Sequence, residues 1–223
     1  MATSASSILV ATPCLDGNVS AHYTGALVGT MPLLTQRGIR CEIQFEIGNS
    51  LIADARNKLV SKFLASTATD LVFIDADISW KPDDLLKLIA HPQPVVAGVY
   101  QRKSRAKVDF AVKFGPTIAM DAGLMEVERV GTGFLRLRRD CLQALVAANP
   151  ALKLKNPLQP GDPNFYALFD TSIVDGQFIG EDFTFCDRWR ALGGKVFIDP
   201  SIGPAHHGAA VYDEAIMKYL QRN

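Results

Sequence analysis

The sequence predicts an α/β fold in which a central, mostly parallel β-sheet carries helices on both faces. Short apolar runs alternate with helix-like segments through the first 100 residues, and this alternation favours parallel strands joined by helical crossovers. The chain has 223 residues, of which 48% are hydrophobic. A single domain with a substantial core is therefore expected over residues 1–223.

The first half shows the alternation of strands and helices most clearly. Residues 39–46 alternate in polarity, as a half-buried strand does. An apolar series with helical spacing follows Asn49 and Ser50, either of which can cap a helix. Pro82 suits the first position of a helix, and two acids follow in its first turn. Strands are expected at residues 7–11, 39–46, 70–75 and 94–100, and helices at 20–36, 52–63 and from 82 onward.

The second half is less regular. Strand-like runs occupy residues 108–114, 125–137 and 195–198, and helices are expected at 138–148, 181–192 and 211–221. Residues 149–178 contain four prolines and little periodicity. A loop of this length inside one domain is usually functional or mobile, so a loop of one of these kinds is expected here.

The charge balance and the cysteine pattern exclude several classes of protein. The 23 basic residues match the 23 acidic ones, so the basic field typical of nucleic-acid-binding proteins is lacking. The four cysteines lie far apart without zinc-site spacing, which is typical of reduced thiols in a cytoplasmic protein. Residues 17–36 contain no Asp, Glu, Lys or Arg but several other polar residues, so no transmembrane segment is expected.

An apolar strand that ends in two carboxylates is the most informative motif. Residues 71–74 are apolar, and Asp75 and Asp77 follow with Ala76 between them. Because side chains alternate along a strand, both carboxylates point the same way at its carboxyl end, where open α/β sheets bind ligands. Such acids also occur in simple turns. Two carboxylates this close repel each other, however, so Mg²⁺ or Mn²⁺ holding phosphate oxygens is the expected partner.

Two later motifs supply further candidate groups. His206 and His207 lie in a segment rich in Gly and Pro, where one imidazole can complete an oxygen-rich Mn²⁺ site or both can be ordinary loop residues. Glu181 and Asp182 follow Gly180 at the start of an expected helix. They either complement the helix dipole, or one of them acts as a general base towards a substrate hydroxyl.

Arg56 and a pair of glycines allow two interpretations each. Arg56 lies on the apolar side of its expected helix, where an unpaired cation is costly. It either reaches solvent or a core acid, or it contacts a nucleotide base or phosphate. Gly131 and Gly133 fit a backbone that passes close to a sugar or phosphate, but a β-bulge explains them equally well.

Taken in order, these motifs resemble those of the GT-A glycosyltransferases, which use nucleotide sugars, and in particular family 2. The likeness extends over most of the chain. It begins with a strand ending in Thr12 and Pro13, followed by Arg56 on the helix before the acidic pair. The pair itself resembles the DxD signature, and the glycine and acidic motifs and His206-x-Gly208 follow in the family's order. A lone DxD is nonspecific, whereas the ordered set is much stronger.

The resemblance implies a Rossmann-like GT-A fold built around one continuous sheet. Residues 1–100 would form the nucleotide-binding half, and residues 101–223 the acceptor half with a smaller mixed sheet. The protein would move a sugar from a nucleoside-diphosphate sugar, such as a UDP- or GDP-sugar, to a hydroxyl of a glycan or another acceptor.

The resemblance also implies a role for each motif. Asp75, Asp77 and His206 would hold Mn²⁺ or Mg²⁺ on the donor diphosphate. Asp182 or Glu181 would face the acceptor as the base of an inverting reaction. The nucleotide itself would lie near Thr12, Pro13, Arg56, Asp75, Ala76 and Asp77.

Two other functions remain compatible with the sequence. A phosphatase of the haloacid dehalogenase type also has an apolar strand ending in Asp-x-Asp, and Asp75 would be its nucleophile. That motif normally opens its domain, however, whereas two strand–helix units precede it here. A non-catalytic protein that only binds nucleotide sugars is the third possibility, although the candidate catalytic acids are present.

Overall fold

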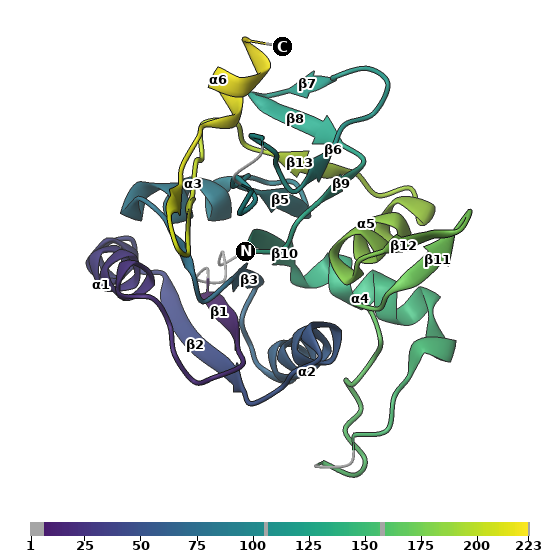
Figure 1. Ribbon diagram of the computed structural model, residues 1–223. Coiled ribbons are helices and arrows are strands. Elements are labelled where there is room, and N and C mark those ends of the chain that lie inside the picture. Colours follow the sequence, from purple (N-terminus) through teal and green to yellow (C-terminus); the bar gives the residue numbers. More distant parts are fainter. Residues whose placement is uncertain (1–6, 105–106, 157–158, 223) are drawn as a thin grey trace.

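An eight-stranded sheet forms the centre of the molecule in a computed structural model that describes residues 7–104, 107–156 and 159–222 (Figure 1). The strand order is β2-β1-β3-β10-β5-β13-β8-β7. The strands are β1 (Ser7–Cys14), β2 (Arg40–Ile47), β3 (Asp70–Ile74), β5 (Val95–Ala97), β7 (Met120–Asp121), β8 (Leu124–Val127), β10 (Phe134–Arg138) and β13 (Val196–Ile198). Only β10 and β8 run against the other six, which confirms a mostly parallel α/β sheet.

Helices cover both faces of this sheet, as predicted (Figure 1). On one face lie α1 (Ala21–Gln36) and α3 (Pro82–Ala90), and on the other lie α2 (Ile52–Ala65), α4 (Arg139–Ala148) and α5 (Glu181–Ala191). Alternate residues of β1 enter different cores: Ile8 packs with α1 and α3, and Leu9 packs with the other three helices. A buried strand of this kind needs apolar residues on both faces, which explains its continuous apolar run.

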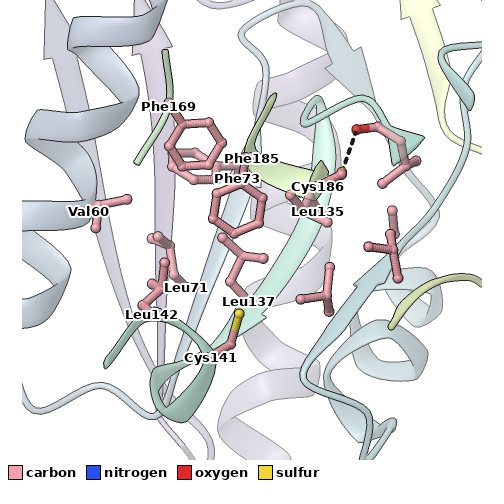
Figure 2. Packing of buried hydrophobic residues seen from close by; sticks show 14 of the residues in the cluster. Val60, Leu71, Phe73, Leu135, Leu137, Cys141, Leu142, Phe169, Phe185 and Cys186 are labelled. Atoms are coloured by element: carbon pink, nitrogen blue, oxygen red, sulfur yellow. Dashed lines mark hydrogen bonds between the residues drawn. The ribbon is translucent and has the colours of Figure 1, made fainter. Parts of the chain in front are cut away.

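The core beneath α4 and α5 joins the two halves of the chain. Figure 2 shows Phe73 of β3 beside Leu135 of β10, with Phe169 and Phe185 packed against them. The Phe169 and Phe185 rings are stacked with centroids 4.6 Å apart, and Phe73 meets Phe169 edge-on at 5.4 Å. In the sheet, β10 and β13 from the second half alternate with β3 and β5 from the first. Both halves therefore share one sheet and contribute to the core beneath α4 and α5.

Three small antiparallel sheets accompany the central one. The first contains β4 (Ile78–Ser79), β14 (Ala205–His207) and β15 (Val211–Tyr212). The second pairs β6 (Val112–Lys113) with β9 (Arg129–Val130), and the third pairs β11 (Ser172–Val174) with β12 (Gln177–Ile179). The first of these sheets is the one that matters for the site, because β4 follows the acidic pair and β14 carries both histidines.

The predicted helix over residues 211–221 is wrong at its start. Val211 and Tyr212 form β15, and the helix α6 covers only Ile216–Leu220. Val211 pairs with His207 across the hairpin. The backbone of this segment therefore forms strand hydrogen bonds, although its apolar spacing predicts a helix. Val211 is β-branched, and such residues favour strands.

Two local details also differ from the sequence prediction. Leu51, rather than Asn49 or Ser50, takes the N-cap position of α2, and the Asn49 side chain accepts a hydrogen bond from the Leu51 amide at 3.1 Å. The long loop contains a short 3₁₀ helix at Pro150–Leu152 and the strand β11. The β11–β12 turn consists of Asp175 and Gly176, both with positive φ, which is a hairpin signal that the sequence interpretation missed.

All four cysteines are free thiols, and all but Cys41 are buried. Among the described residues, no helix combines the length and the hydrophobicity needed to cross a bilayer.

Candidate active site

The strand order leaves a candidate ligand site at the carboxyl ends of β1 and β3. The chain passes from β1 through α1 to β2 on one side, then through α2 to β3 on the other side of β1. This reversal leaves a crevice of the kind that holds ligands in α/β proteins. A cavity of about 520 Å³ lies there, which is a size suited to a small-molecule ligand. Its lining includes Pro13, Ser20, Ile52, Asp75, Ala76, Asp77 and His206.

Most residues predicted to bind the nucleotide or the metal meet at this cavity. Pro13 comes from the end of β1, the acidic pair from the end of β3, and His206 from β14. The amide of Ser20, the N-cap of α1, donates a hydrogen bond to the Ala76 carbonyl at 2.8 Å, which ties the acidic pair to the start of that helix. Thr12 lies beneath the cavity instead, and its hydroxyl bonds to that of Tyr23 at 2.7 Å.

Arg56 is buried between two acids. Its side chain is 4% exposed, and Nη2 lies 3.0 Å from Asp75 Oδ1 while Nε lies 3.2 Å from Glu181 Oε1. The guanidinium also lies over the Phe73 ring at 5.3 Å. Burial would lower its pKa, but the charges of Asp75 and Glu181 outweigh burial and leave the pKa raised. Arg56 therefore pairs with two partly buried acids, and it does not line the cavity.

Replacing Arg56 with leucine is expected to destabilise the protein by about 3 kcal/mol, because two partly buried carboxylates would lose their cation. Urea unfolding measures this loss. Arg138→Leu is the matched control, since Arg138 forms an exposed pair with Asp140 at 3.5 Å that is worth less than about 1 kcal/mol. Equal losses in both variants would contradict a structural role for the Arg56 bridge.

Asp77 is the acid most strongly held in its charged form. Its Oδ1 lies 3.4 Å from His206 Nε2, and its Oδ2 forms an ion pair with Lys103 Nζ. Burial would raise its pKa, but the hydrogen bonds and charges of His206 and Lys103 prevail and lower the pKa to about 2. Asp77 is thus ionised at any physiological pH. Sequence reasoning missed Lys103, because a lysine in a loop carries no distinguishing pattern.

The two histidines have different partners. His206 donates a hydrogen bond from Nδ1 to the Gln101 carbonyl, 3.1 Å away, and this contact aims Nε2 at Asp77. His207 instead contacts Ser79 Oγ through Nε2 at 2.7 Å and stacks on His22 with ring centroids 4.1 Å apart. Of the two histidines, only His206 lines the cavity.

The predicted metal ligands are partly assembled. Asp77 and His206 face each other and offer one carboxylate and one imidazole, which are suitable donors for Mn²⁺. Asp75 lines the same cavity, but its Oδ1 is engaged by Arg56. In the described part of the chain, no group of three or more His, Cys, Asp or Glu side chains is arranged to hold a metal. The residues fit an ion that keeps much of its coordination for phosphate and water.

Glu181 and Asp182 begin α5 but differ in environment. Glu181 is occupied by Arg56, whereas Asp182 forms no ion pair among the described residues. Asp182 is partly buried, and burial together with the nearby Glu181 charge raises its pKa. A carboxylate with a raised pKa is the better proton acceptor, so Asp182 is the stronger candidate for a general base.

The glycine motif serves packing against an aromatic ring. A Cβ atom at Gly133 would lie 2.6 Å from the Tyr100 ring, and one at Gly131 would lie 2.9 Å from its hydroxyl. The Gly133 amide donates to the Tyr100 hydroxyl at 3.1 Å, and the Gly133 carbonyl accepts from the Asp75 amide at 3.1 Å. Tyr100 in turn meets His206 edge-on at 5.2 Å. Gly133 thus bonds to the Asp75 backbone, and both glycines pack against the tyrosine that contacts His206.

A second cavity of about 550 Å³ adjoins the first, and Ile52 lines both. The start of α2 forms one wall, and the long loop predicted to be functional or mobile forms the other with Leu154, Phe169 and Asp170. This loop therefore contributes to a cavity beside the acidic pair.

Among the comparisons with known proteins, the likeness to A197 supports the fold. A197 from STIV is 17% identical over 93% of both chains, with a TM-score of 0.54. A glycosyltransferase involved in the glycosylation of the major capsid of PBCV-1 is 9% identical over 64% of this chain and 66% of its own, with a TM-score of 0.36. Mannose-1-phosphate geranyltransferase from Thermus thermophilus is 14% identical over 64% of this chain and 60% of its own, with a TM-score of 0.39.

At such low identities these likenesses concern the fold alone, and the A197 likeness extends over almost the whole chain. No protein-family model matches the sequence, and no curated protein matches it. Function must therefore be argued from the site itself.

Proposed function

We propose that this protein is a glycosyltransferase of the GT-A type that takes its sugar from a nucleoside-diphosphate sugar. The observation that carries the proposal is the position of Asp75 and Asp77. They leave β3 at the switch point of the sheet and line a 520 Å³ cavity together with His206. Pairs of acids in this place suit a diphosphate held through a divalent cation.

The donor nucleotide would occupy the cavity between Pro13 and the acidic pair. Asp77 and His206 would hold Mn²⁺ or Mg²⁺, which when bound offsets the negative charge of the departing diphosphate. Asp75 would face the ribose or the sugar, because its orientation is set by Arg56. Arg56 itself would act by positioning Asp75 and Glu181 and would not touch the nucleotide.

Asp182 would serve as the general base of an inverting transfer. The acceptor oxygen forms a bond to the anomeric carbon of the sugar while Asp182 takes its proton. The bond between that carbon and the diphosphate oxygen breaks, and its electron pair leaves with the nucleoside diphosphate. The second cavity, which Ile52 joins to the donor cavity, is the proposed acceptor site. Its acceptor would be a glycan or another molecule with a hydroxyl group.

Isothermal calorimetry with UDP, GDP and other nucleoside diphosphates, with and without Mn²⁺, tests the donor site. We expect one of them to bind only, or much more tightly, with the metal. A matching screen of nucleotide sugars for metal-dependent hydrolysis would identify the sugar. If none of the nucleoside diphosphates bound at any Mn²⁺ concentration, the proposal would be wrong.

The phosphatase alternative receives less support. The acidic pair follows two strand–helix units instead of opening the domain, and Oδ1 of Asp75 is engaged by Arg56 at 3.0 Å, so only Oδ2 could act as a nucleophile. Phosphatase turnover without any nucleotide sugar, together with phosphorylation of Asp75, would favour this alternative. A protein that only binds nucleotide sugars would show donor affinity but neither hydrolysis nor transfer.

The histidine assignment predicts different effects for two adjacent residues. His206→Ala is expected to weaken Mn²⁺ affinity by about tenfold or more, because Nε2 faces Asp77. His207→Ala is the matched control and should change that affinity little, because its ring is engaged by Ser79 and His22. Titration of each variant with Mn²⁺ measures both effects, and the opposite ranking would move the ligand to His207.

A further inference from the structure

Lys103 places a positive charge inside the proposed donor site. It lies in the segment after β5, and its ammonium group contacts Asp77 Oδ2 while His206 faces the other oxygen of the same carboxylate. Its side chain is 36% exposed, so the ammonium group is accessible from solvent. The sequence motifs do not account for this residue, and the metal-binding role proposed for Asp77 does not include it.

The surroundings of Lys103 are built to hold it there. A Cβ atom at Gly208 would lie 3.2 Å from both Cδ and Cε of Lys103, so the glycine leaves room for the aliphatic stem. The His206 ring contacts the Gln101 carbonyl at 3.1 Å, and the His207 amide donates to the Asp77 carbonyl at 2.8 Å. These bonds tie the segment before Lys103 and the acidic pair to the same short strand.

Two cations cannot share one carboxylate without competing. A divalent ion bound between Asp77 Oδ1 and His206 would lie beside the same carboxylate whose other oxygen, Oδ2, now pairs with the Lys103 ammonium group. Repulsion would move the ammonium group away from Asp77, and its flexible stem allows such movement. The donor diphosphate would then offer negative charge within the same cavity, and lysine commonly binds phosphate as a point charge.

We propose that Lys103 is a diphosphate-binding residue that occupies Asp77 in the metal-free protein and transfers to the donor diphosphate when the metal binds. This inference rests on the donor-binding function proposed above. It assigns to Lys103 two effects of opposite sign: the residue hinders binding of the metal alone, and it strengthens binding of the diphosphate in the presence of the metal.

Calorimetry with Mn²⁺ alone and with inorganic pyrophosphate in saturating Mn²⁺ tests the two effects separately. Lys103→Met keeps the length of the stem and removes the charge. It is expected to tighten Mn²⁺ binding about three- to fivefold, because the competing ammonium group is lost. It is expected to weaken pyrophosphate binding about tenfold or more, because a charged hydrogen bond is lost.

Two further variants serve as controls. Lys113→Met removes an exposed lysine that is ion-paired with Glu128 at 2.9 Å, and it should leave both affinities unchanged. Lys103→Arg keeps the charge and should retain most of the pyrophosphate affinity. Thermal unfolding of each variant checks that the fold is intact, because a purely structural role would change stability without producing opposite shifts in the two affinities.

The outcomes separate this inference from the proposed function. If the wild-type protein binds nucleoside diphosphate and pyrophosphate but Lys103→Met leaves pyrophosphate affinity unchanged, the role of Lys103 is overturned and the donor site stands. Weaker Mn²⁺ binding in Lys103→Met would likewise overturn it, because the lysine would then assist the metal. If the wild-type protein binds neither ligand, both proposals fail.

Discussion

Asp77→Asn is expected to weaken Mn²⁺-dependent binding of a nucleoside diphosphate by about 100-fold or more. Loss of a partner beside a metal ligand already costs about 10- to 100-fold in affinity, and this change removes a proposed ligand's own charge. His206 and Lys103 hold Asp77 ionised, with its pKa lowered to about 2. The amide of asparagine keeps the shape of the side chain but cannot offset the charge of the metal. Asp77→Ala should have the same effect.

Asp77→Asn should also change how the stability of the protein depends on pH in acid. The pKa of Asp77 is lowered from its usual 3.8 to about 2, so its ionised form stabilises the fold above pH 3.8. That contribution is lost as the pH falls from 3.8 towards 2, because the proton then binds in the folded state as well. Urea unfolding between these pH values should show a smaller loss of stability for Asp77→Asn than for the wild-type protein.

Asp121→Asn is the matched control for both measurements. Asp121 is exposed on β7, at the opposite end of the strand order from β1, and it does not line the cavity. Its replacement should leave the affinity and the acid response unchanged. Retention of full nucleoside-diphosphate affinity by Asp77→Asn would remove the central support for a metal-held donor at this site.

Asp182→Asn is expected to lower the turnover number for transfer by about 10²- to 10⁴-fold while donor affinity changes little. This range is typical for loss of a general base. Burial and the neighbouring Glu181 raise the pKa of Asp182, which improves its ability to accept a proton. Steady-state kinetics with the donor found in the screen, together with calorimetry, separates the loss of turnover from a loss of binding.

The raised pKa also predicts the pH response. The wild-type rate should fall as the pH drops through the raised pKa of Asp182, because the protonated acid cannot accept the acceptor's proton. A raised carboxyl pKa means that the fold favours the neutral form, so the ionised group costs stability as the pH rises above 3.8. In Asp182→Asn, the residual rate should no longer fall as the pH drops through this range. At neutral pH this variant should unfold at a temperature no lower than that of the wild-type protein.

Glu181→Gln is the informative comparison for Asp182. It removes the negative charge 3.2 Å from Arg56 Nε, so a loss of stability is expected together with a smaller loss of rate. A reversed result, in which Glu181→Gln is inactive and Asp182→Asn retains full turnover, would make Glu181 the base.

The local sequence pattern was sufficient to predict the architecture and to identify the principal acids of the site. The apolar run before Asp75 predicts a buried strand because such a strand needs apolar side chains on both faces, and β3 and its ligand-facing end follow from that. Helix starts such as Pro82 depend on a few neighbouring residues, and α3 begins there. The hairpin at Asp175 and Gly176 was also readable from its two residues, although it was overlooked.

Contacts between segments that are distant in the sequence determined the partners of the site residues and the secondary structure near the C-terminus. Arg56 and Glu181 are 125 residues apart, so no local pattern could reveal that the buried arginine pairs with this acid as well as with Asp75. Val211 lies in a strand because of its pairing with His207, which outweighs helical spacing. The charge on Asp77 is likewise controlled by Lys103 and His206. Spacing along the chain therefore located the carboxylates, whereas their partners and pKa values depend on distances that only the folded chain defines.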